Sequence, residues 1–162
     1  MNVKLLPLLL LGSCTLSGCY LNARLYPVNG PLSARTPAPI YAARISGAIR
    51  SGSFSATLEN GEVCKGSWTS ISNSPKQNNG HVSVDDSSAP ELVSAWDTVY
   101  GQGFYRANVL GAHIHIHGLL NGNQGTVMQV DAYLNDEARA DSRDARKGVA
   151  TDNHGNVYKL AF

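Results

Sequence analysis

Three of the chain's five histidines stand two residues apart, as His113, His115 and His117. On a β-strand, alternate side chains share one face, and neighbours on that face are about 6.5–7 Å apart. Two adjacent imidazoles could therefore reach one metal ion, and zinc and copper are metals that accept such nitrogen ligands. This run predicts a zinc or copper site. The candidates for a further ligand are His81, His154, Asp131 and Cys64.

The same run has a simpler interpretation, in which the imidazoles only face solvent. Ile114 and Ile116 alternate with the histidines, so they would face the core while the three rings stay hydrated. No acidic residue flanks the run to orient a ligating imidazole, as outer partners commonly do. In this arrangement the histidines could become charged together near a pH of about 6 and alter a surface contact.

No other group of residues has the spacing of a catalytic site. The sequence lacks a Gly-x-Ser-x-Gly motif, a phosphate-binding P-loop and a Cys-x-x-Cys pair. The glycines of Gly101-Gln-Gly103 are better explained as the end of a helix. Cys64 has no neighbouring base, and a buried small hydrophobic residue is the commoner role of such a cysteine. We therefore expect a protein that is not an enzyme.

The elements that would carry these residues are short strands separated by turns. Alternation is clearest from Ser53 to Leu58, where Phe54, Ala56 and Leu58 share one face. Asn60-Gly61 then predicts a hairpin. Further turns are predicted at residues 121–125 and 152–155. The expected strands cover residues 41–50, 53–58, 63–70, 104–110, 112–120, 126–134, 148–151 and 156–162.

One helix is predicted in the middle of the chain. Ser88-Ala-Pro-Glu91 has the pattern of a capping box, and Leu92, Trp96 and Val99 follow at helical spacing. The predicted fold is mainly β, with one short helix. It is a small antiparallel barrel or sandwich of about seven or eight strands that covers residues 40–162. The polar segments predicted to lie on the surface are residues 72–88, a loop, and residues 135–147, a loop or short exposed helix.

The N-terminus is typical of a secretory signal. Lys4 supplies a positive charge, an apolar run follows from Leu5 to Leu11, and small residues come next. This run is far shorter than the roughly 20 residues of a membrane-spanning helix. We expect residues 1–18 to be removed as a signal peptide.

The signal ends in Leu16-Ser17-Gly18-Cys19, which resembles the lipobox of bacterial lipoproteins at each of its four positions. In that family the cysteine thiol receives a diacylglycerol, cleavage occurs just before the cysteine, and the new amino group is usually acylated. The resemblance implies that Cys19 becomes the lipidated first residue, because two or three acyl chains give stable anchoring. The alternatives are lipidation at Cys14 and an ordinary secreted protein cleaved near Gly18.

The mature chain resembles small proteobacterial lipoproteins without an assigned function, in the segments 57–68 and 152–162. Tyr20 follows the lipidated cysteine where an Asp would retain Gram-negative relatives in the inner membrane, so the resemblance favours the outer membrane. The protein would be anchored there by its lipid and would face the periplasm or the cell surface. The expected function is a non-enzymatic binding or structural module of the cell envelope, with an envelope protein or a glycan as partner. The alternative is zinc or copper binding by the histidine run.

Residues 19–39 hold four prolines without a periodic pattern, and they are predicted to be a flexible tether. The alternative is that Leu21, Leu25 and Tyr26 dock on the domain. Lys4 is the one basic residue of the signal, so the mature chain keeps twelve of the 13 Lys and Arg residues against 12 acidic ones. This balance gives no basis for nucleic-acid binding.

Overall fold

The computed structural model describes residues 20–48, 50–71, 76–78, 81–83, 90–110, 112, 114–134 and 145–162. The predicted signal peptide (1–18), Cys19 and His113 lie outside these residues. Ser88, the predicted cap of the helix, lies outside them as well.

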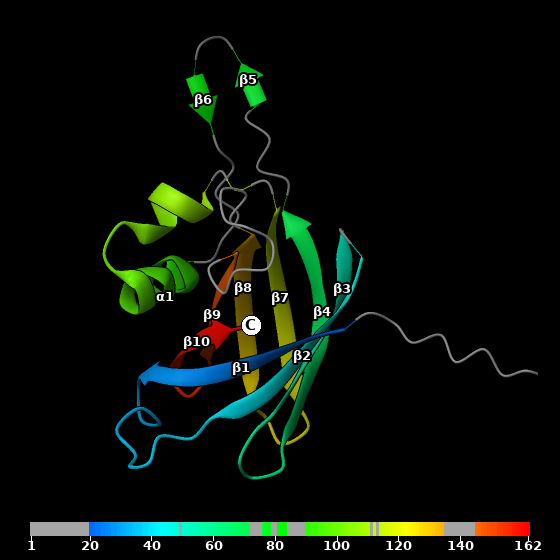
Figure 1. Cartoon of the computed structure of the whole chain (residues 1–162), viewed down its shortest axis with the longest axis vertical. Helices are drawn as coiled ribbons and strands as arrows, with labels where there is room; N and C mark the ends of the chain where they lie inside the picture. The colour runs from blue at the N-terminus through cyan, green and yellow to red at the C-terminus, as the bar shows by residue number, and fades with distance from the viewer. Residues whose placement is uncertain are drawn as a thin grey trace, which may run out of the picture.

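Within the described residues, eight antiparallel strands form a closed barrel in which strands that follow one another in the chain are neighbours (Figure 1). The first and last strands pair with each other and close it. The expected mainly β fold is confirmed, as a barrel and not a sandwich. A separate two-stranded sheet consists of β5 (Lys76–Asn78) and β6 (His81–Ser83). The barrel strands are β1 (Tyr20–Asn29), β2 (Tyr41–Gly47), β3 (Ser51–Thr57), β4 (Val63–Ile71), β7 (Ile114–Gly122), β8 (Val127–Leu134), β9 (Arg146–Asp152) and β10 (Val157–Ala161).

Strand β1 corrects the prediction of a flexible tether over residues 19–39. Residues 20–29 are paired with β2 on one side and with β10 on the other. Leu25 is fully buried and Leu21 packs on the same core, so docking of this segment, the alternative expectation, is correct for both. Without β1, strands β2 and β10 would each expose an unpaired edge. Residues 30–40 then connect β1 to β2.

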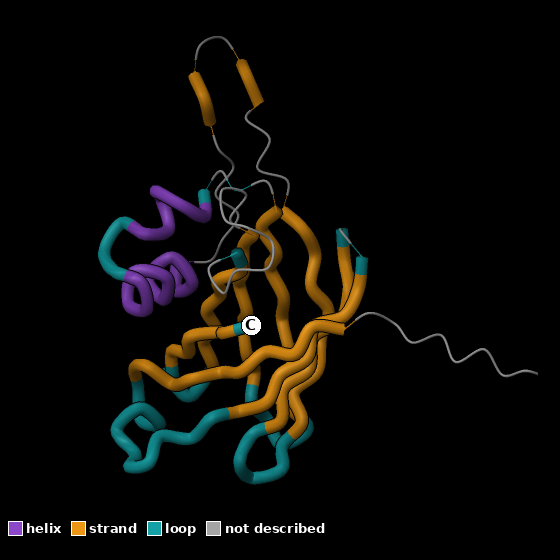
Figure 2. Tube along the Cα trace, in the orientation of Figure 1, coloured by secondary structure: helices purple, strands orange, loops and turns teal. Residues whose placement is uncertain are grey.

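A helical segment lies against the outside of the barrel, beside β9 and β10 (Figures 1 and 2). Helix α1 (Pro90–Tyr100) confirms the predicted helix and ends before Gly101, whose φ is 106°. A π-helical turn, η1 (Tyr105–Val109), follows, so the strand predicted for residues 104–110 is wrong. Tyr105 and Val109 are four residues apart and both buried, which is the spacing of a helix face. No helix among the described residues is long and apolar enough to cross a membrane.

The two segments predicted to lie on the surface differ in part from the structure. Residues 72–88 include the short hairpin of β5 and β6. In the segment 135–147, Ala145 is buried and Arg146 begins β9. Residues 135–144 lie outside the described part of the chain. The charged composition of the segment therefore conceals the start of a barrel strand.

Two apolar clusters lie on opposite sides of the barrel wall. The inner cluster fills the barrel with side chains such as Leu25, Phe54 and Leu120. The outer cluster lies between the helical segment and the outer face of β8 and β9. Strand β8 therefore has buried residues on both of its faces. The members of the outer cluster are Leu92, Ala95, Trp96, Tyr105, Val109, Tyr133 and Val149.

Three hairpin turns at one end of the barrel, which we name the turn end, have the same construction. They join β3 to β4, β7 to β8 and β9 to β10, and each has a glycine with positive φ: Gly61 (78°), Gly125 (104°) and Gly155 (79°). In each turn this glycine donates its N–H to the carbonyl three residues earlier, which is a type I turn followed by a G1 bulge. Side chains of Asn123 and Asn153 accept hydrogen bonds from adjacent strands and link the turns. The predicted turns are confirmed.

Candidate functional site

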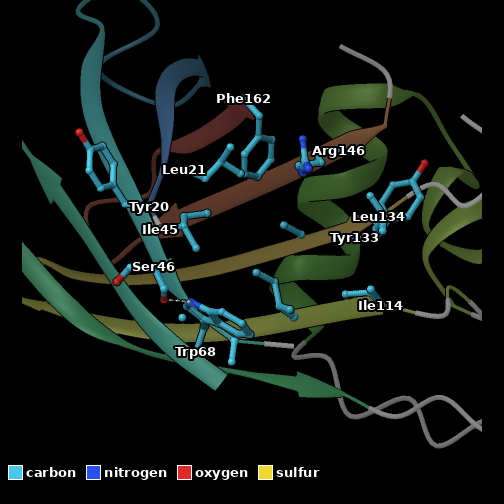
Figure 3. A pocket seen from close by; sticks show the side chains of 14 residues that line it. Tyr20, Leu21, Ile45, Ser46, Trp68, Ile114, Tyr133, Leu134, Arg146 and Phe162 are labelled. Carbon is cyan, nitrogen blue, oxygen red and sulfur yellow. Dashed lines mark hydrogen bonds between the residues drawn. The ribbon is translucent and has the colours of Figure 1, made fainter. Parts of the chain in front are cut away.

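The opposite end of the barrel, where β1 begins and β10 ends, contains a cavity of about 470 Å³ (Figure 3). We name it the mouth cavity. Its volume lies within the roughly 300–1,000 Å³ that is typical of small-molecule sites. An eight-stranded barrel is just wide enough to hold one small ligand. The lining residues are Tyr20, Leu21, Ile45, Ser46, Gly47, Ala48, Trp68, Ile114, Ile116, Ala132, Tyr133, Leu134, Arg146 and Phe162.

Trp68 forms one wall of the mouth cavity, and its ring is held in place. The indole N–H donates a hydrogen bond of 3.1 Å to the carbonyl of Ser46 (Figure 3). Gly47 and Gly52 lie against the ring, and a Cβ at either position would come within 3 Å of it. These two glycines therefore create the space that the indole occupies. The result is a rigid apolar wall that needs no rearrangement before a ligand binds.

Arg146 carries the one charged side chain among the described residues that line the mouth cavity. It begins β9, where Gly148 and Ala150 are buried and share its face of the strand. The two-residue repeat of a strand therefore places Arg146 on the inner face, at the rim. It pairs across the sheet with Leu134 of β8. Its side chain is exposed, and no carboxylate of the described residues forms a salt bridge with it.

The turn end is polar, and the carboxylates of buried Glu62 and half-buried Asp152 accept hydrogen bonds there. Glu62 accepts hydrogen bonds from the backbone N–H groups of Gln124 and Thr126 and from the Thr126 hydroxyl. Burial acts to raise the pKa of Glu62, but these hydrogen bonds outweigh it and the pKa is lowered. Burial, followed by a hydrogen bond of 2.6 Å donated to Asp152, raises the pKa of Tyr158. Both carboxylates are already bound within the protein, so we interpret this end as structural.

Two histidines of the run, His115 and His117, lie on β7, and the structure corrects the simpler interpretation of the run. Ile114 and Ile116 do face the barrel interior, where they line the mouth cavity. His115 faces the outside but is only 1% exposed, because it packs under the helical segment. Its Nε2 lies 2.8 Å from one oxygen of Asp131, and the Trp96 indole N–H donates to the other oxygen at 2.7 Å. Asp131, on the neighbouring strand β8, is the acidic partner that the residues flanking the run do not supply.

The predicted metal site has no counterpart among the described residues. His117 is partly exposed, and its Nδ1 lies 3.9 Å from Asp131, which is too long for a hydrogen bond. No three His, Cys, Asp or Glu side chains in the described ranges are grouped so that they could hold a metal ion. A metal site that includes His113 remains a prediction. Nε2 of His115 is hydrogen-bonded to Asp131, so this nitrogen is not available as a metal ligand in the structure.

Two cysteines, Cys19 and Cys64, lie outside the predicted signal peptide. Cys64 is fully buried and free, as expected. Burial, with the nearby charges of Glu62 and Asp152, raises the pKa of Cys64 to about 11, so the reactive thiolate is scarce at neutral pH. Lipidation of Cys19 remains a prediction. The next residue, Tyr20, already belongs to β1 and lines the mouth cavity.

Comparisons with protein families, with curated proteins and with solved structures found no significant match. The geometry of the mouth cavity is therefore the main basis for a functional proposal. Arg146 is not among the functional residues that the sequence predicts, because the charged composition of residues 135–147 indicates a solvated segment. The signal that could have identified it is the phase of the strand, since steps of two back from Ala150 lead to Arg146.

Proposed function

We propose that this protein is a lipid-anchored, non-enzymatic binding module of the bacterial cell envelope, and that it holds a small apolar ligand in the mouth cavity. The observation that carries the proposal is a cavity of about 470 Å³ with mainly apolar walls in a closed barrel. Burial of apolar ligand surface in such a cavity contributes about 25 cal/mol per Å². The described lining contains no His, Cys, Asp or Glu that could serve as a base or nucleophile, which favours binding over catalysis.

The anchoring part of the proposal rests on the sequence. The lipobox Leu16-Ser17-Gly18-Cys19 supports lipidation of Cys19, and Tyr20 supports the outer membrane as its location. The domain would face the periplasm or the cell surface. An envelope protein or a glycan is the alternative partner, and it would bind a polar outer surface instead of the apolar cavity.

Anchoring is tested by comparing the wild-type chain with Cys19→Ser in a Gram-negative host. We expect the wild-type protein to sediment with outer membranes and to carry the added mass of a diacylglycerol. We expect Cys19→Ser to lack that mass and to leave the outer-membrane fraction. An unmodified wild-type protein, or a Cys19→Ser variant that keeps the lipid, would contradict anchoring at this residue.

Ligand binding is tested on residues 20–162, which contain all eight barrel strands. The probe is N-phenyl-1-naphthylamine, a neutral apolar dye whose fluorescence increases in apolar sites. We expect saturable binding of one dye per protein, weakened at least tenfold by Ile114→Trp, which fills the mouth cavity. Leu119→Trp is the matched control, because Leu119 lies on the same strand but is exposed on the outer face. Absence of saturable binding, or equal loss in both variants, would refute the proposed ligand site.

A further inference from the structure

The position of Arg146 does not follow from the needs of the fold. A guanidinium is charged at every physiological pH, and the other side chains that line the mouth cavity carry no charge that could pair with it. Its next two neighbours on the inner face of β9 are Gly148 and Ala150, and neither carries a side chain larger than a methyl group. The planar guanidinium can form two parallel hydrogen bonds to a carboxylate or a phosphate, and such charge-assisted pairs are among the strongest in proteins.

We infer that the mouth cavity binds an amphiphile with one alkyl chain and one anionic headgroup, the chain in the apolar cavity and the headgroup on Arg146. This inference rests on the proposed function and names its ligand class. A neutral apolar molecule would leave the guanidinium without an ionic partner. A glycan would leave the apolar walls without a matching surface. An anionic amphiphile satisfies both parts of the site at once.

The dimensions of the site favour a single chain. The volume of about 470 Å³ is at the small end of ligand sites, and the barrel below it is filled by side chains such as Phe54, Leu120 and Leu160. The rim also lies next to the predicted anchor, because Tyr20 lines the cavity and directly follows Cys19. A membrane is the nearest source of single-chain anions, namely free fatty acids and lysophospholipids.

The test compares probes that share one chain and differ only in the headgroup. Dodecanoate, dodecyl phosphate and 1-dodecanol, each below its micelle concentration at pH 7.5, are used to displace N-phenyl-1-naphthylamine from residues 20–162. We expect at least one of the two anions to bind tenfold or more tightly than the neutral alcohol. A tighter dodecanoate identifies a carboxylate ligand of the fatty-acid type, and a tighter dodecyl phosphate identifies a lysophospholipid type.

Variants of Arg146 separate this inference from the proposed function. We expect Arg146→Ala to remove the preference for the anion, measured as the ratio of the affinity for the anion to the affinity for 1-dodecanol in the same variant. Arg146→Lys keeps the charge but loses the planar fork, so part of the preference should remain. Arg24→Ala is the control, because Arg24 is exposed on the outer face of β1 and is not part of the cavity lining.

Two results would overturn the inference and leave the proposed function intact. In the first, the anions and the alcohol bind the wild-type protein equally well. In the second, Arg146→Ala keeps the preference for the anion. If the dye itself does not bind, the proposed apolar ligand site is refuted, and the inference about the headgroup is refuted with it.

Discussion

At the scale of single residues, Asp131 links the helical segment to the barrel. Its carboxylate is fully buried, and it accepts one hydrogen bond from Trp96 on α1 and one from His115 on β7. It therefore connects three elements through two oxygens of one side chain. A buried carboxylate without such partners would be strongly destabilising, so the network fixes the position of α1 on the barrel.

We expect Asp131→Asn to lower the free energy of unfolding by about 3 kcal/mol, because the amide cannot accept from both buried donors. The change preserves side-chain volume, so the loss reflects hydrogen bonding and charge. The control is Glu59→Gln, which removes an exposed salt bridge to Arg35 and should cost less than about 1 kcal/mol. Urea unfolding measures both. Equal losses in the two variants would show that the buried network has no special role.

The lowered pKa of Glu62 predicts that the free energy of unfolding falls at acid pH. Its pKa is lowered in the folded protein from the ordinary value of 4.5, so between the two values the unfolded chain binds more protons than the folded one. The stability that Glu62 contributes is therefore complete above about pH 4.5 and is lost as the pH falls through the lower, folded pKa. Urea unfolding between pH 3 and pH 7 should show this loss, and Glu62→Gln should make the acid side of the profile flatter. A variant with the wild-type slope would contradict this assignment.

At the scale of elements, the strands and turns with local signals are the predictable part. The Asn-Gly pair of the β3–β4 turn and the alternation of apolar and polar residues in β3 can be recognised in the sequence, because both depend on near neighbours in the chain. Strand β1 could not be predicted in this way, because it lies in a proline-rich segment that indicates a tether, and its pairing partner β10 is more than a hundred residues away. The turn η1 is missed because its apolar residues fit a strand as well as a helix until the surface beneath them is known.

Removing β1 tests whether residues 20–29 are a strand that the barrel needs or part of a flexible tether. We expect residues 30–162 to lose cooperative unfolding and to aggregate, because the missing strand leaves two open edges. We expect residues 20–162 to stay folded, and circular dichroism with size-exclusion chromatography distinguishes the folded chain from the truncated one.

Within residues 20–162, Leu25→Ala should lower the free energy of unfolding by about 2–5 kcal/mol, since Leu25 is fully buried. The neighbouring exposed residue provides the control, and Arg24→Ala should change stability by less than about 0.5 kcal/mol.

At the scale of the whole molecule, the barrel has two chemically different ends. The turn end carries Glu62 and Asp152 in closed hydrogen-bond networks, whereas the mouth cavity is apolar with a basic rim residue. The pattern of short strands predicts a barrel or a sandwich, and the structure shows that the fold is a closed barrel. The site is not predictable in the same way, because the chain does not say which ends of its strands enclose space. The pairing of His115 with Asp131 also depends on the register between β7 and β8.

The start of β1 at Tyr20 also determines how far the domain could move if Cys19 carries lipid. One peptide unit spans about 3.8 Å, whereas twenty extended residues would reach roughly 60 Å. The domain would therefore stay at the bilayer surface and would not search the periplasm for partners. A ligand could pass between the membrane and the mouth cavity by lateral exchange, without crossing bulk water. Partners on the opposite side of the envelope would have to come to this protein.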